Sequence, residues 1–70
     1  MGKMYIDDRG WKYKVMGGIG GKYKIRFQTD RQSGDVGWKG YPVIPWRDTL
    51  EDAEADLEDQ AKKRGWKLVE

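Results

Sequence analysis

The segment "WKYKVMGGIGGKYKIRF", residues 11–27 of this 70-residue chain, has the clearest strand pattern in the sequence. Its two ends, Trp11–Val15 and Tyr23–Phe27, alternate apolar and basic residues, a pattern typical of strands with one buried and one solvated face. The glycine-rich piece between them is short enough to connect two antiparallel strands. We therefore predict a β-hairpin whose aromatic side chains share one face and whose basic side chains share the other.

The glycines in the middle of this stretch also invite comparison with phosphate-binding loops. A Walker A loop anchored on Gly21 and Lys22 requires a glycine where the chain has Met16 and a hydroxyl residue where it has Tyr23. A dinucleotide-binding loop fails at the same tyrosine. Both kinds of loop precede a helix, whereas the residues that follow here have the period of a strand. We predict no nucleotide site and interpret the glycines as turn residues.

The C-terminal third of the chain changes to a helical period. Apolar residues recur three or four apart, at Leu50, Ala53, Leu57 and Ala61. A capping-box-like start is available at Asp48 or at Thr49, and Gly65 is suited to ending the helix. Acidic residues crowd the first turns and basic residues the last, which complements the helix dipole.

The remaining segments complete a small sheet. Met4–Ile6 is expected to form a short strand, and the segment before Pro42 an edge strand that ends near Gly40, because proline cannot donate to a ladder. Trp66 and Leu68 are expected to return to the core. Residues 1–70 are thus predicted to be a single α+β domain, in which an antiparallel sheet of three to four strands packs on one C-terminal helix, in the order β-β-β(-β)-α-β.

Composition argues against several classes of function. The chain has no cysteine and no histidine, so disulfides, thiolate metal sites and the commonest catalytic bases are excluded. Ser33, Thr29 and Thr49 have no assignable base beside them. We therefore expect a non-enzymatic protein without metal or cofactor. The absence of a long apolar run and of a signal-like start favours a cytoplasmic protein that contacts no membrane. We expect a monomer, with head-to-tail self-association through the oppositely charged segments as the alternative.

Charge is segregated along the chain. Residues 1–47 carry ten basic and four acidic residues, whereas residues 48–70 carry eight acidic and four basic ones. Strand alternation places five cations on the hairpin face opposite the aromatic rings: Lys12, Lys14, Lys22, Lys24 and Arg26. Such a face is suited to a polyanion, nucleic acid first and an acidic protein second. It is equally what a solvated sheet face requires, and no aromatic ring can be assigned to it for stacking on bases.

A second surface suggests a protein-interaction module or a small structural subunit instead. The predicted helix carries a row of acids that could dock a basic partner, and the segment "YPVIPW" could present an apolar strip or simply cover the core. The candidate contacts of this alternative are Glu51, Glu54, Asp56, Glu58, Val43, Ile44 and Trp46.

The layout of a hairpin sheet before one acidic helix, together with "AKKRGW" at Ala61–Trp66, resembles small bacterial or phage-encoded domains. The resemblance points to no single family, so no functional residue is transferred from it.

Overall fold

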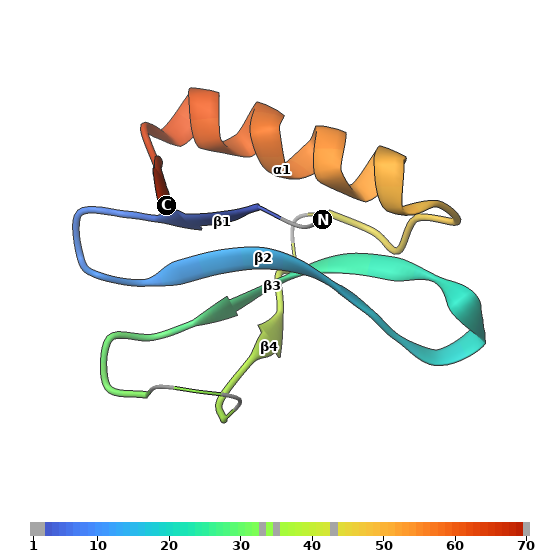
Figure 1. The fold of residues 1–70 in the computed structure, drawn as a ribbon, viewed down its shortest axis with the longest axis horizontal. Helices are drawn as coiled ribbons and strands as arrows, with labels where there is room; N and C mark the ends of the chain where they lie inside the picture. Colours follow the sequence, from blue (N-terminus) through green and yellow to red (C-terminus); the bar gives the residue numbers. More distant parts are fainter. Residues whose placement is uncertain (1–2, 33, 35, 43, 70) are drawn as a thin grey trace.

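The computed structural model describes residues 3–32, 34, 36–42 and 44–69, in which five strands form one antiparallel sheet and a single helix lies on one side of it (Figure 1). The strands lie in the order β4-β3-β2-β1-β5. The elements are β1 (Met4–Ile6), β2 (Lys12–Gly17), the 3₁₀ turn η1 (Ile19–Gly21), β3 (Tyr23–Gln28), β4 (Lys39–Gly40), α1 (Leu50–Arg64) and β5 (Lys67–Val69). The predicted α+β fold is confirmed, with one strand more than expected.

The hairpin predicted for residues 11–27 consists of β2 and β3. Tyr13 lies opposite Phe27 and Val15 opposite Ile25, so the alternating aromatic and aliphatic side chains share one face. The chain reverses through η1, where Gly20 and the glycine after it have φ near +70°. Residues with a Cβ rarely adopt such angles, which explains why glycines occupy this turn.

The sheet reaches five strands because an edge strand forms at each of its two ends. β4 pairs with β3 as the expected edge strand, and β5 pairs with the outer edge of β1. Leu68 was expected in the core, but it is 46 % exposed because its strand is the outermost of the sheet. Trp66 does return to the core, where its ring stacks on that of Tyr13 at a centroid distance of 3.7 Å.

Helix α1 begins and ends as its sequence predicts. The Thr49 hydroxyl accepts a hydrogen bond from the backbone N–H of Asp52, at 3.2 Å. Gly65 adopts a left-handed conformation and its backbone N–H is bonded to the carbonyl of Ala61. Both features satisfy backbone groups that a helix end leaves unpaired.

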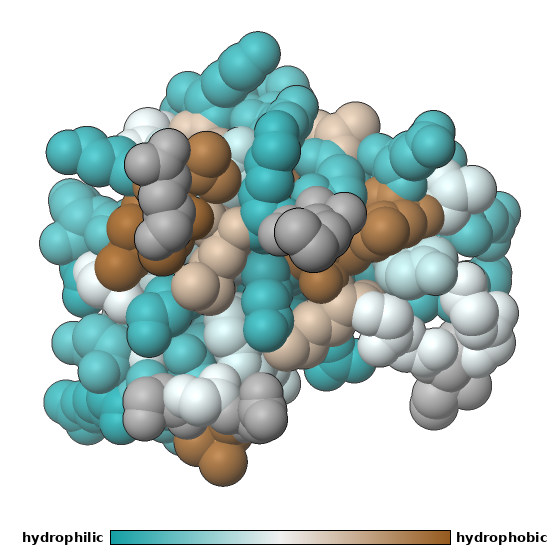
Figure 2. All heavy atoms as spheres, in the orientation of Figure 1, coloured by the Kyte–Doolittle hydropathy of each residue, from teal (hydrophilic) through white to brown (hydrophobic). Residues whose placement is uncertain are grey.

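The core lies between α1 and the central strands. Tyr13, Ile25 and Leu57 are buried there, and further aromatic rings pack around them. Seen from the side drawn in Figure 2, the apolar groups form separate small patches bordered by polar side chains. Within the described ranges, no helix is long and apolar enough to cross a membrane.

Candidate nucleic-acid interface

The sheet has one face turned away from α1, which we call the open face. Strand register decides which side chains lie on it: Lys14 is opposite Arg26, Lys12 is opposite Gln28, and Lys24 is opposite Met16. Along each strand these cations alternate with residues of the core, such as Tyr13 in β2 and Ile25 in β3. The cations therefore point away from the helix. Four of the five predicted cations thus share the open face, and all four are half-buried.

The fifth predicted cation, Lys22, lies just outside β3. Its side chain is exposed, and its ammonium nitrogen is 3.5 Å from a carboxylate oxygen of Asp48. Both side chains of this ion pair are more than half exposed, so solvent strongly screens the attraction between them. Lys22 therefore borders the other four cations at the turn end of the hairpin.

Trp38 adds an aromatic ring to the open face. Because Lys39 is opposite Phe27, continuing the register places Trp38 beside Gln28, on the side away from the helix. Its indole N–H donates to the carbonyl of Gly34 at 3.0 Å, and the ammonium of Lys14 lies 4.7 Å from its ring centroid. The loop that precedes β4 thus holds the ring against β2.

Trp46 adds a second ring. After β4 the chain returns to the edge of β3, where Arg47 forms an isolated bridge with Tyr23. The neighbouring Trp46 consequently lies on the open face, with Lys24 at 5.6 Å and Arg26 at 5.8 Å from its ring centroid.

The ring of Trp46 rests on the glycine turn. A Cβ built on Gly18 would lie 2.4 Å from the ring of Trp46, a distance that real Cβ atoms do not show. Gly18 has extended backbone angles, so its role is to leave space and not to adopt a special conformation. We predicted that the glycine-rich turn only reverses the chain, but it also packs against the ring of Trp46.

The expectation that no aromatic ring lies among the cations is therefore wrong. Alternation does send the hairpin's own rings toward α1, but Trp38 and Trp46 come from the segment that runs along the other edge of β3. A sequence signal existed: Trp38 is three residues from Tyr41, whose ring packs in the core. An odd spacing in an extended segment places two side chains on opposite faces. We call Lys14, Lys24, Arg26, Trp38 and Trp46 the basic–aromatic cluster.

The open face also has an apolar part on its β1 side. Met4 is opposite Lys14 and Ile6 is opposite Lys12. On the other side of β1, Val69 of β5 is opposite Met4. All three apolar side chains are half-buried. The lysine stems of β2 lie next to them, which is the usual way in which long basic side chains cover apolar surface.

The four helix acids of the alternative surface lie on two sides of α1: Glu51, Glu54 and Glu58 line one hollow, whereas Asp56 lies apart from them. Asp56 accepts from the guanidinium of Arg47 at 2.6 Å, and Glu58 accepts from Lys3 at 2.5 Å. Glu54 also accepts from the backbone of residue 3, while Glu51 is exposed in the first turn.

The strip "YPVIPW" does not form one exposed surface either. Ile44 is half-buried against the core, whereas Trp46 lies on the open face and is 41 % exposed. Val43 lies outside the described residues. The side chains named for a protein contact therefore do not share one face.

No protein-family model, curated protein or solved structure matches this chain. In the part of the chain that the structure describes, no three acidic side chains are grouped so that they could hold a metal ion.

Proposed function

We propose that this protein binds nucleic acid through the open face, and that it prefers single strands to duplexes. The observation that carries the proposal is the basic–aromatic cluster, in which the rings of Trp38 and Trp46 lie within 6 Å of the cationic groups of Lys14, Lys24 and Arg26. Sequence-tolerant single-strand binders combine the same two features, cations for the phosphates and rings for the bases.

The preference for single strands follows from the shape of the cluster. Bases in a duplex are stacked on one another and cannot stack on a protein ring, whereas those of a single strand can. Within the described residues the only helix is on the far side of the sheet, so no helix projects from the open face to enter a groove.

The spacing of the rings suggests the length of the site. In the register of β3, Trp38 is beside Gln28 and Trp46 is beside Lys24, four residues further along the strand. Four residues of a strand span about 13 Å, which corresponds to about four stacked nucleotides at about 3.4 Å each. We propose a site of this length, with a ring at each end, in a cytoplasmic protein.

The test is a fluorescence-anisotropy titration of labelled 12-nucleotide single strands and 12-base-pair duplexes at 50 mM salt. We expect saturable binding of the single strand and weaker binding of the duplex. Trp46→Leu should weaken single-strand binding by about 5-fold or more, since stacking of one base contributes about 1–3 kcal/mol. Its effect on duplex binding should be smaller.

A matched pair of charge reversals separates local contact from net charge. Lys24→Glu should weaken binding by about 10-fold or more, while Lys63→Glu should change it by less than about 2-fold. Both variants change the net charge equally, but Lys63 is exposed on α1, where it pairs with Asp59. Absence of binding at 50 mM salt, or equal effects of the two variants, would contradict the proposal and favour a protein partner or a solvated sheet face.

A further inference from the structure

A second candidate site lies between α1 and the sheet, on the opposite side of the sheet from the open face. It is a hollow of about 390 Å³ at the end where the β1–β2 turn, the segment after β4 and the end of α1 meet. Five aromatic side chains line it: Trp11, Tyr13, Phe27, Tyr41 and Trp66. Its volume is within the range of about 300–1,000 Å³ that small-molecule pockets occupy.

The rings form ordered walls. Trp11 stacks on Phe27 at 5.8 Å with an interplanar angle of 10°, and Tyr13 stacks on Trp66 at 3.7 Å with an angle of 7°. Tyr41 meets the second pair edge-on, at about 80° or more. The rings of each pair cover one another and Tyr13 is only 3 % exposed, so the hollow is bordered by the outer faces and edges of the pairs. These are apolar surfaces that suit a planar group.

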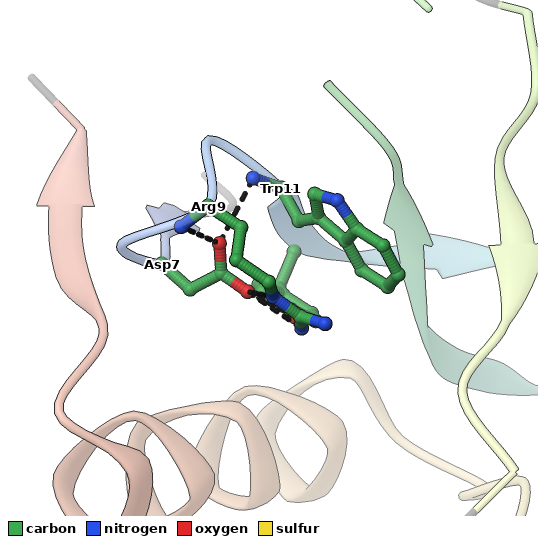
Figure 3. Close-up of polar contacts among 4 residues, drawn as sticks. Asp7, Arg9 and Trp11 are labelled. Carbon is green, nitrogen blue, oxygen red and sulfur yellow. Dashed lines mark hydrogen bonds and ion pairs between the residues drawn. The ribbon is translucent and has the colours of Figure 1, made fainter. Parts of the chain in front are cut away.

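Arg9 supplies a fixed cation at the rim. Figure 3 shows its guanidinium between the carboxylate of Asp7 and the indole of Trp11. It donates to Asp7 Oδ2 through Nε at 3.2 Å and Nη2 at 2.9 Å, and its central carbon is 3.7 Å from the Trp11 ring centroid. More than half of the Arg9 side chain is nevertheless exposed. The second terminal nitrogen, Nη1, is in none of these bonds.

Asp7 is not an acceptor for a ligand, because its oxygens are already used. One oxygen accepts from the backbone N–H groups of Arg9 and Trp11, and the other from Arg9 and the Tyr13 hydroxyl. Its side chain is only 6 % exposed. Arg64, also on the rim, uses Nε for Gln60 and has two further nitrogens. The rim therefore offers guanidinium donors, while its buried acceptor is saturated.

We infer that this hollow binds a small aromatic carboxylic acid, with its ring against the aromatic lining and its carboxylate at Arg9 and Arg64. Guanidinium groups pair with carboxylates in a planar, often bidentate geometry. A monoanion fits better than a dianionic phosphate, because the exposed carboxylate of Asp8 borders the same hollow and repels negative charge.

The four tryptophans provide a readout that separates the two sites. Trp11 and Trp66 line the hollow, whereas Trp38 and Trp46 belong to the open face. We propose to titrate the ¹⁵N-labelled 70-residue chain with indole-3-acetate and to follow the four indole N–H resonances, assigned by single Trp→Phe variants. The matched neutral probe is indole-3-acetamide.

We expect saturable shifts of the Trp11 and Trp66 resonances, with a dissociation constant of about 1 mM, and at least about 10-fold weaker binding of the amide. Arg64→Gln should weaken the acid about 5-fold, the loop variant Arg31→Gln should leave it unchanged, and Asp8→Asn should strengthen it about 2-fold. All three side chains are exposed, and Arg64→Gln gives up the bond from Nε to Gln60 alone, so we expect these variants to keep the fold.

Three results would overturn the inference: no saturation by about 20 mM, equal affinity for acid and amide, or shifts confined to Trp38 and Trp46. Binding of a single-stranded oligonucleotide, followed on Trp38 and Trp46, reports on the open face alone. Failure of either site is therefore seen independently of the other.

Discussion

At the scale of single residues, the carboxylate of Asp7 accepts more hydrogen bonds than any other side chain among the described residues. Burial acts to raise the pKa of Asp7, but hydrogen bonds from the Tyr13 hydroxyl, from Arg9 and from two backbone N–H groups outweigh it, so the pKa of Asp7 is lowered. The same burial and the bond to Asp7 raise the pKa of Tyr13 to about 12. One short turn thereby orders a carboxylate, a guanidinium and a phenol at the edge of the core.

Asp7→Asn should destabilise the fold by about 2–3 kcal/mol at pH 7, because an amide has one acceptor oxygen where the carboxylate has two. A lowered folded-state pKa means that the carboxylate stabilises the fold above its unfolded pKa of about 3.9. That contribution is lost as the pH falls through the folded value.

Urea unfolding at pH 7 and at pH 3 measures both effects of Asp7→Asn. The difference in the free energy of unfolding between the wild type and the variant should shrink at the lower pH. Asp8→Asn, the exposed neighbour, is the matched control and should change stability by less than about 0.5 kcal/mol. A difference that stays constant with pH would mean that the charge of Asp7 does not stabilise the fold.

At the scale of elements, the sequence predicted what depends on local periodicity and failed where the path of the chain decides. The alternation in residues 11–27 and the spacing of Ala53, Leu57 and Ala61 determine which faces are buried, and the structure confirms both. Leu50, predicted on the same helix face, is 40 % exposed in the first turn of α1. The position of Trp38 could have been predicted from its odd spacing to Tyr41. The position of Trp46 depends on the return of the chain along β3, which no local pattern encodes. The hollow at the end of α1 is likewise formed by three segments that are distant in sequence.

The predicted cap at the N-terminus of α1 can be tested by its effect on stability. Thr49→Ala removes the hydroxyl that accepts from Asp52 and should cost about 1 kcal/mol. For a domain of this size, that corresponds to a fall in Tm of about 4–8 °C by calorimetry. Thr49→Ser keeps the acceptor and should retain most of the stability. Equal losses in the two variants would show that the threonine methyl group, and not the cap, stabilises the helix.

At the scale of the whole molecule, the two layers carry opposite charge. The open face of the sheet bears Lys12, Lys14, Lys24 and Arg26, while the acidic row of α1 lies on the other side. Such an arrangement orients the molecule as it approaches a polyanion, because the acidic layer is repelled and the basic layer attracted. Over the thickness of the domain, however, salt at physiological strength screens the helix from the ligand.

The salt dependence of single-strand binding tests this separation of layers. If the four open-face cations each neutralise one phosphate, the logarithm of the association constant should fall with the logarithm of salt concentration with a slope of about −3, at about −0.7 per contact. Lys24→Gln should reduce the magnitude of the slope by about 0.7. Glu51→Lys, an exposed change on α1, should leave the slope unchanged and raise the affinity by less than about 2-fold at physiological salt. A slope that steepens in Glu51→Lys would show that the helix side contacts the nucleic acid, so that binding does not belong to the open face alone.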